Sequence, residues 1–286
     1  MKRIFLALML VLAVIGGALF FRGEALALSW RASAVDEITF TDLVSKLDPH
    51  ITVSRPDKID GLLPIIIQMH GCGGLSLPRH AEWADIANEA GFISVIVDSN
   101  RPRGFGRDLA MDTVCQGKAL LGQERAADIL AAYDIALSDP QADPDRVYLA
   151  GWSHGAWSIM DFMTMGPSKL PAGLRDYDGG WPSIEGLILF YPHCGLGALS
   201  RVRGWQSEPD TLAFIAGADT VVNHKACLSQ LAALKDSGLP TETIVYADAQ
   251  HGFDNAMLPS GPSDWYNDEH TNDAKRRYRA FLKARN

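Results

Sequence analysis

The chain has 286 residues, of which 47% are hydrophobic and 21% are charged, and 34 acidic against 26 basic residues give a net charge of −8. This composition is typical of a folded globular protein and excludes a mainly disordered chain, a collagen-like chain and a small disulfide-dependent scaffold. No basic cluster offsets the acidic balance, so nucleic acid is not expected as a partner.

The first segment is predicted to direct export rather than to join the fold. Lys2 and Arg3 precede an uncharged apolar stretch of about 18 residues, 4–21, which is long for a signal peptide and just long enough to span a membrane. Residues 25–27 have the Ala-Leu-Ala pattern that a signal peptidase cleaves. The sequence favours a cleaved signal peptide in residues 1–27, with an uncleaved membrane anchor as the alternative. Either one predicts an exported protein, periplasmic or secreted, that contacts the membrane only through this segment if it is retained.

Strand-like and helix-like segments alternate along the rest of the chain. Near-continuous apolar runs predict strands buried on both faces, and apolar residues at helical spacing predict the helices between them. The predicted strands are 62–69, 92–97, 146–150, 184–191, 211–216 and 243–246. The predicted helices are 79–90, 122–138, 154–165, 223–236 and 270–284. We therefore expect a single α/β domain over residues 36–286, in which a mostly parallel sheet lies between two layers of helices. Residues 167–183 are rich in Gly, Pro and Asp and are expected to cross over the sheet without a domain boundary.

A candidate nucleophile follows the predicted strand 146–150. Residues 151–155 read Gly-Trp-Ser-His-Gly and fit the pattern G-x-S-x-G. A strand before the pattern and a helix after it are the setting of a nucleophile elbow, in which a sharp turn exposes the serine above the sheet. The context therefore predicts Ser153 as a nucleophile.

A serine nucleophile needs a base and an acid, which in this arrangement follow it in the order acid, then histidine. His251 follows the last predicted strand, and Asp219 follows strand 211–216, so both lie on loops at the carboxyl edge of the sheet. We expect Asp219 to orient His251 and to stabilise its imidazolium. Asp248 and Asp254 are rival acids, but both lie too near His251 to occupy a separate loop.

Backbone amides are expected to stabilise the oxyanion. One is the amide of His154, directly after the nucleophile. The other belongs to the loop after strand 62–69, which reads His-Gly-Cys-Gly-Gly over residues 70–74, close to the HGGG motif of esterases. By position this second donor is the amide of Cys72, and the amide of Gly73 is a further candidate. No metal or organic cofactor is implied.

These motifs together resemble the α/β-hydrolase fold and, within it, the dienelactone hydrolase family. The resemblance covers roughly residues 60–255 and rests on the loop 70–74, Asp98-Ser99, the elbow 151–155, Asp219 and residues 251–253. The well-known members use a cysteine nucleophile, whereas this chain has a serine at the elbow. The resemblance therefore implies a general carboxylic ester or lactone hydrolase, similar to exported members of the family.

The chain has four cysteines, an even number that in an exported protein favours disulfides over free buried thiols. Four cysteines allow three pairings, and the absence of C-x-x-C spacing argues against zinc. With the loops placed as the resemblance implies, we expect Cys72 to pair with Cys115 and pin the oxyanion loop. Cys194 is then expected to pair with Cys227 and brace the loop that carries Asp219.

Several arginine and aromatic side chains around the site have more than one interpretation. Arg101, Arg103 and Arg107 lie in the loop after strand 92–97, where they either bind an anionic substrate group or pair with nearby acids. Pairing with acids is the simpler expectation. The aromatic candidates for pocket walls are Trp152, Trp157, Tyr191 and His193, of which Trp157 is expected to pack in the core.

The sequence thus predicts an exported serine hydrolase that acts on small-molecule esters through an acyl-enzyme. One alternative is a peptidase of the prolyl oligopeptidase type, although about 60 residues before the core leave no room for that family's propeller domain. The other is a non-catalytic binding protein on the same fold.

Overall fold

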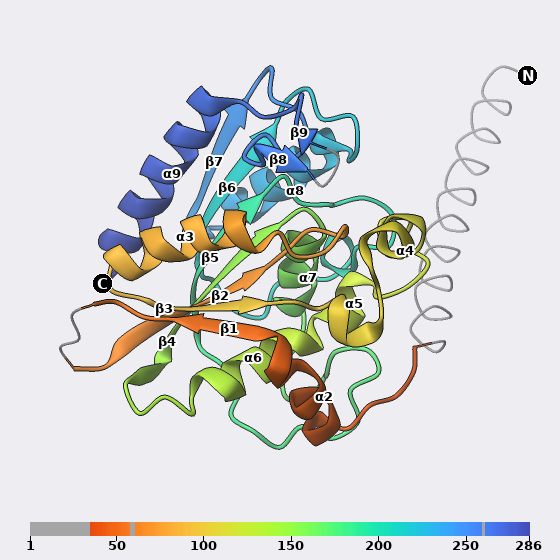
Figure 1. Ribbon diagram of the computed structural model, residues 1–286, viewed down its shortest axis with the longest axis vertical. Helices are drawn as coiled ribbons and strands as arrows, with labels where there is room; N and C mark the ends of the chain where they lie inside the picture. The colour runs from red at the N-terminus through yellow and green to blue at the C-terminus, as the bar shows by residue number, and fades with distance from the viewer. Residues whose placement is uncertain (1–34, 58–60, 259–260) are drawn as a thin grey trace, which may run out of the picture.

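A seven-stranded sheet forms the centre of the protein (Figure 1). The computed structural model describes residues 35–57, 61–258 and 261–286. The strands of the sheet are β1 Ile51–Ser54, β2 Leu63–Met69, β3 Ile93–Val97, β4 Ala142–Trp152, β5 Ile184–Phe190, β6 Asp210–Ala216 and β7 Thr241–Tyr246. Their order is β1-β3-β2-β4-β5-β6-β7, and only β1 runs antiparallel to its neighbour. The mostly parallel sheet is confirmed.

Helices cover both faces of this sheet. They are α2 Phe40–Leu47, α3 Leu77–Glu89, α4 Arg107–Asp112, α5 Gly122–Arg125, α6 Ala127–Ala136, α7 His154–Phe162, α8 His224–Asp236 and α9 Asp268–Lys283. Short 3-10 turns occupy Asp48–His50, Arg101–Arg103 and Leu199–Arg201, and a small hairpin joins β8 Met257–Leu258 to β9 Gly261–Pro262.

Two separate apolar cores lie on either side of the sheet. Ile65 and Ile67 of β2 belong to the core under α2, α6, α7 and α8, whereas Ile66 belongs to the core under α3 and α9. Successive side chains of a strand point to opposite faces, so an unbroken apolar run serves both cores at once. The expected three-layer arrangement is confirmed.

Several elements differ from the sequence prediction. The helix expected over 122–138 is two helices that meet at Ala126, and the second ends at Ala136, before the Asp-Pro pair at 139–140. The loop after β3 contains α4, and neither α2 nor β1 was predicted. β1 is a four-residue edge strand without a fully buried residue, so it lacks the continuous apolar run that marks the other strands.

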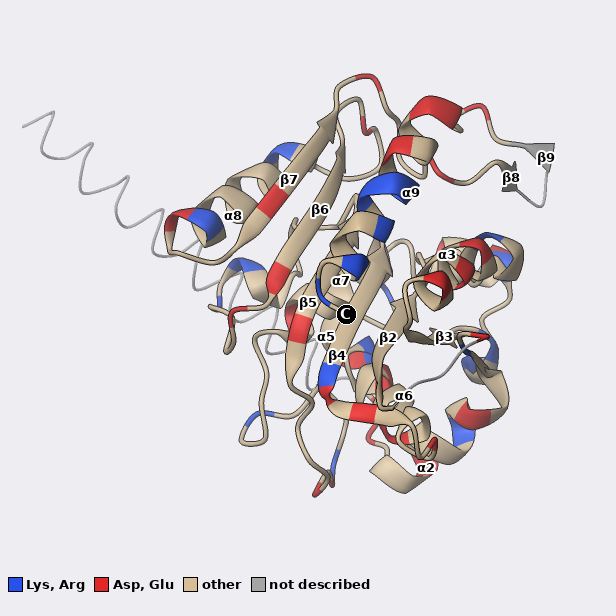
Figure 2. Ribbon diagram, turned by 90° about the vertical axis from the view of Figure 1, so that its left-hand side faces the viewer, with Lys and Arg blue, Asp and Glu red and all other residues tan. Residues whose placement is uncertain are grey.

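The closing helix is held by ion pairs. Lys and Arg residues gather on α9, and acidic residues lie on α3, β6 and β7 (Figure 2). The pairs of α9 are Lys275–Glu82, Arg279–Glu89 and Arg277–Glu242, and Arg285, just after its end, pairs with Asp210. The basic character of this helix therefore serves its docking onto an acidic surface.

The leader predicted in residues 1–27 lies outside the described residues. Over the described ranges, the structure contains no helix that is long and apolar enough to cross a membrane.

Candidate active site

Ser153 occupies a sharp turn between β4 and α7. Its φ of 53° and ψ of −110° lie outside the common regions for a residue with a side chain, which costs about 1–3 kcal/mol. The turn also passes very close to its neighbours. A Cβ on Gly151 would lie 2.6 Å from the Ala156 nitrogen, and one on Gly155 would overlap the Met69 carbonyl. Both glycines of the pattern are therefore steric requirements of the turn.

The serine, histidine and aspartate predicted from sequence lie in hydrogen-bonding distance of one another. Ser153 Oγ is 2.8 Å from His251 Nε2, and His251 Nδ1 is 2.7 Å from Asp219 Oδ2. The other carboxylate oxygen of Asp219 accepts hydrogen bonds from the amides of Val221 and Val222, at 2.8 and 2.9 Å. Residues 98 positions apart in the chain, Ser153 and His251, are thus joined by the fold.

The charge of Asp219 selects the tautomer of the histidine. Burial acts to raise the pKa of Asp219, but hydrogen bonds from His251 and from the two backbone amides outweigh it and hold the pKa below its ordinary value. The ionised carboxylate accepts a hydrogen bond from Nδ1–H of His251, which fixes the proton on that nitrogen. Nε2 is then left with a lone pair toward Ser153 Oγ, which is the arrangement a general base requires.

Neither rival acid contacts His251. Asp248 is largely exposed and accepts a hydrogen bond from His270 Nε2 at 2.8 Å. Asp254 is buried, and its two oxygens accept hydrogen bonds from Tyr191 and Trp152.

The glycine-rich loop after β2 passes beside the serine. A Cβ on Gly71 would lie 3.7 Å from Ser153 Cβ. Asn100 Nδ2 donates to the Cys72 carbonyl at 2.9 Å, and among the described residues no acceptor is found for the Cys72 amide. His154 is the first residue of α7, a position whose amide has no partner within the helix. Two amides are thus available next to the nucleophile.

A neutral histidine supports this loop from below. His70 is fully buried, its Nε2 accepts a hydrogen bond from the Ser99 amide at 3.1 Å, and its Nδ1 donates to the Gly71 carbonyl at 2.6 Å. Burial, followed by the nearby charge of Arg125, lowers the pKa of His70 to about 4. The ring is therefore uncharged at neutral pH, as its acceptor role requires.

The sequence analysis missed Arg125, which is fully buried behind both oxyanion candidates. It donates to Ser99 Oγ at 2.8 Å, to the His70 carbonyl at 2.7 Å and to His154 Nδ1 at 3.2 Å. Burial lowers its pKa to about 10, so it remains charged at neutral pH. The sequence offered little signal, because Arg125 is one of three charged residues in the stretch 120–133, with Glu124 and Asp128.

Two disulfides are present, in the pairing that the sequence analysis expected. Cys72 is bonded to Cys115, and Cys194 to Cys227. The first joins the oxyanion loop to the segment after α4. The second joins the loop after β5 to the first turn of α8.

The three loop arginines have different surroundings. Arg103 forms a two-point ion pair with Asp128, at 3.0 and 2.7 Å, so its charge is used within the fold and not for a substrate. Arg107 is exposed and lies over the oxyanion loop, with Nη1 3.2 Å from the position of a Cβ on Gly73. No ion pair of Arg101 or Arg107 is found in the part of the chain that the structure describes.

Three of the aromatic pocket candidates are buried. Trp152, Trp157 and Tyr191 are at most 5% exposed, and Trp157 donates to the carboxylate of Asp161 at 2.7 Å. His193 is partly exposed and packs on Trp157, with ring centroids 5.0 Å apart. Of the four, His193 alone is open toward solvent.

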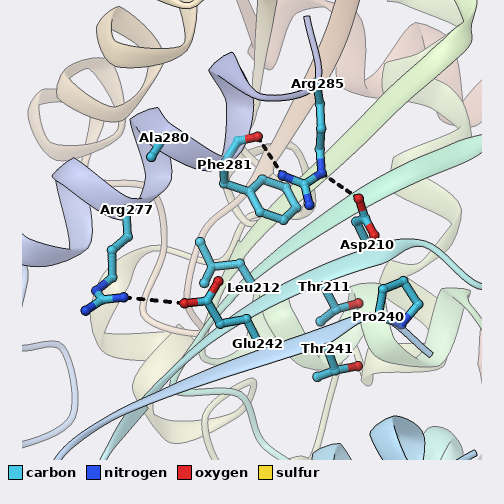
Figure 3. A pocket seen from close by; sticks show the side chains of 10 residues that line it. All are labelled: Asp210, Thr211, Leu212, Pro240, Thr241, Glu242, Arg277, Ala280, Phe281 and Arg285. Carbon is cyan, nitrogen blue, oxygen red and sulfur yellow. Dashed lines mark hydrogen bonds and ion pairs between the residues drawn. The ribbon is translucent and has the colours of Figure 1, made fainter. Parts of the chain in front are cut away.

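A hollow of about 480 Å³ lies at the opposite end of the sheet, between β6, β7 and α9 (Figure 3). Its two arginines point toward acids: Arg277 pairs with Glu242 at 3.4 Å and Arg285 with Asp210 at 2.7 Å. Because both are neutralised in place, we assign the hollow no ligand. Within the described ranges, no group of three or more His, Cys, Asp or Glu is arranged to hold a metal.

Comparison with known proteins identifies the fold. The model of the prolyl oligopeptidase family matches residues 81–176. The acylamino-acid-releasing enzyme of Arabidopsis thaliana is 23% identical in an alignment 221 residues long that covers 67% of this chain, and the chain spans 28% of that enzyme's length.

Solved structures give the same result over more of the chain. A carboxylesterase from Lactobacillus plantarum superposes with a TM-score of 0.58 at 18% identity, covering 82% of this chain and 92% of that one. A dienelactone hydrolase-like promiscuous phosphotriesterase from metagenomic libraries superposes with a TM-score of 0.56 at 14% identity, covering 82% and 98%. The chain therefore has the α/β-hydrolase fold, and the resemblance to dienelactone hydrolases seen in its motifs is confirmed at the level of fold.

Proposed function

We propose that the chain is a serine hydrolase that cleaves carboxylic esters or lactones. The observation that carries this proposal is the continuous hydrogen-bonded series from Ser153 Oγ through His251 to Asp219, beside two available amides. Esterases and a dienelactone hydrolase-like enzyme among the structural neighbours support the same chemistry.

In the proposed reaction, Ser153 attacks the ester carbonyl while His251 takes the hydroxyl proton. The amides of Cys72 and His154 stabilise the tetrahedral oxyanion, and Asp219 stabilises the imidazolium. The intermediate collapses, the bond to the leaving alcohol breaks, and His251 returns the proton to that alcohol. Water then attacks the acyl-enzyme with His251 as base, which releases the acid and restores Ser153.

We also propose that the protein acts outside the cytoplasm. Disulfides persist in oxidising compartments and are rare in the cytosol. The two disulfides agree with the export signal predicted in residues 1–27, cleaved or retained as an anchor.

Labelling with a fluorophosphonate probe tests the nucleophile, because this probe reacts with activated serines. We expect one labelled site in the wild-type protein, at Ser153, and none in Ser153→Ala. The same substitution should reduce hydrolysis of p-nitrophenyl acetate by at least about 10⁴-fold. Ser158→Ala is the matched control, since Ser158 lies one turn further along α7 and donates to the His154 carbonyl. A wild-type protein that is not labelled would instead support a binding protein without catalysis.

A peptidase is the second candidate, favoured by the match to the prolyl oligopeptidase family and by the plant relative. Both activities would use the same serine, so labelling does not separate them. Parallel assays on p-nitrophenyl esters and on the p-nitroanilides of N-acetylated amino acids do. We expect kcat/KM for the esters to be the larger by at least about 100-fold, and the reverse order would favour the peptidase.

A further inference from the structure

A second buried carboxylate lies behind the candidate site, and the proposed reaction gives it no role. Asp254 has a fully buried side chain three residues after His251. Its Oδ1 accepts a hydrogen bond from Tyr191 OH at 2.6 Å, and its Oδ2 accepts one from Trp152 Nε1 at 2.9 Å. Both oxygens are therefore engaged by side chains that are 63 and 102 positions away in sequence.

The two donors border the two reacting groups. Trp152 is the last residue of β4 and is bonded directly to Ser153 in the elbow. The ring of Tyr191 lies against the imidazole of His251, with centroids 4.7 Å apart and planes 57° from parallel. One carboxylate thus connects the residue before the nucleophile to the ring that supports the base.

The backbone conformation of Tyr191 indicates that the surrounding structure forces its ring into this position. Its φ is 36°, a left-handed value that is uncommon for a residue with a bulky side chain. Such a conformation persists where the surroundings over-determine it. Here the Tyr191 amide donates to the Phe214 carbonyl at 2.7 Å, while its hydroxyl is held by Asp254. Together these bonds turn the ring toward His251.

The charge of Asp254 is balanced inside the same cluster. Arg79 of α3 has Nη1 3.7 Å from Asp254 Oδ1 and 3.4 Å from Tyr191 OH. Its guanidinium also lies over the ring of Trp152, 5.7 Å from the centroid. A buried carboxylate needs such a partner, because an isolated charge in this position would be strongly destabilising.

We propose that Asp254 is a positioning residue of the proposed hydrolase. It holds Trp152 and Tyr191 in one hydrogen-bonded unit. This unit keeps Ser153 Oγ and His251 Nε2 within hydrogen-bonding distance while the proton passes between them. The inference rests on the proposed function, since it gives Asp254 a part in that reaction.

The test compares three variants with the wild-type protein. In Asp254→Asn, the amide group can accept only one of the two hydrogen bonds, because its nitrogen is a donor that faces another donor. In Tyr191→Phe the ring remains, and the hydroxyl's bond to Asp254 is lost together with its longer contact with Arg79. Asp248→Asn is the matched control: it removes one carboxylate three residues before His251, where the side chain is 77% exposed and paired with His270.

The measurements are kcat and KM on p-nitrophenyl acetate and the rate of fluorophosphonate labelling, with circular dichroism as the check on folding. We expect Asp254→Asn and Tyr191→Phe each to lower kcat and the labelling rate by about 10-fold to 100-fold, with KM changed less than about two-fold, because small displacements of reacting groups have effects of this size. The double variant should lose about as much as the worse single variant, since the residues act as a unit. Asp248→Asn should keep both rates.

The possible outcomes separate the inference from the proposed function. Folded Tyr191→Phe and Asp254→Asn proteins with wild-type kcat and labelling rate would overturn the positioning role and leave the hydrolase intact. If Asp254→Asn does not fold, the result from Tyr191→Phe decides alone. A wild-type protein that is neither labelled nor active on the ester would overturn both.

Discussion

The two disulfides offer a controlled test of how the oxyanion loop is held. Cys72 carries one of the proposed oxyanion amides and is bonded through its side chain to Cys115, whereas Cys194–Cys227 lies away from the elbow on the loop after β5. Removing each bond as a pair, with Cys72→Ala and Cys115→Ala or with Cys194→Ala and Cys227→Ala, leaves every backbone amide in the chain.

The expected loss of stability is nearly equal for the two pairs. The bonds close segments with sequence separations of 43 and 33 residues. Loop-closure entropy in the unfolded chain then predicts a loss of about 4 kcal/mol in the free energy of unfolding for either pair. Activity should differ, because only the first pair fixes an oxyanion donor. Deleting such a donor costs about 10²–10³ in kcat, so a donor that is present but less well held should cost about 10-fold.

Urea denaturation measures the stability, and kcat on p-nitrophenyl acetate at a temperature where both variants are folded measures the chemistry. Loss of Cys194–Cys227 should leave kcat within about three-fold of wild type, because Asp219 is held independently by the amides of Val221 and Val222. Equal losses of kcat in both variants would refute the reasoning, as would full activity without Cys72–Cys115.

Three further predictions follow from the geometry. Gly155→Ala should lower the free energy of unfolding, measured by urea denaturation, by about 3 kcal/mol or more, because the new Cβ would overlap a backbone carbonyl of β2. Gly166→Ala is the control and should not destabilise the protein, since no atom lies within 4 Å of its new Cβ. Burial lowers the pKa of His70 to about 4, so between pH 6.5 and pH 4 the unfolded chain takes up a proton that the folded protein does not. The free energy of unfolding is therefore unaffected by this group above pH 6.5 and falls by about 3 kcal/mol as the pH is lowered toward 4. Urea denaturation between pH 7 and pH 4 should therefore show a steeper loss in wild type than in His70→Gln, and equal slopes would contradict it. The guanidinium of Arg107 lies over Gly73 of the oxyanion loop, where it can bind an anionic group of the substrate. Arg107→Gln should therefore lower kcat/KM about 10-fold for esters that carry a carboxylate and leave kcat/KM for neutral esters unchanged. Equal effects on both classes of ester would rule out a role of Arg107 in binding the anionic group.

Much of the fold follows from local patterns. The apolar run of β2 predicts a strand buried on both faces, and the run supplies both cores. The elbow is equally local, because its glycines and its strand-turn-helix context are contiguous in sequence. Elements without such a pattern were missed: β1 is a short, half-exposed edge strand that is defined by its pairing with β3.

The residues of the candidate site likewise divide into those that local patterns predict and those that they do not. Ser153, His251 and Asp219 could be predicted because each follows a strand, and parallel strands deliver such residues to one edge of the sheet. Arg125 and Asp254 could not be assigned their contacts. The hydrogen-bond partners of Arg125 lie between 26 and 55 positions away, and the hydrogen-bond donors to Asp254 lie 63 and 102 positions away.

By itself, then, the sequence determined the alternation of strands and helices, the elbow and the order of the candidate residues, since these depend on periodicity and on steric demands within a few residues. The tertiary structure alone decided the partners of the two rival acids: Asp248 pairs with His270 at the surface, and Asp254 with Tyr191 and Trp152 in the interior. All three acids lie within reach of the histidine along the chain or on a neighbouring loop. The partner of each rival acid depends on how separate segments pack together, and sequence spacing does not encode that packing.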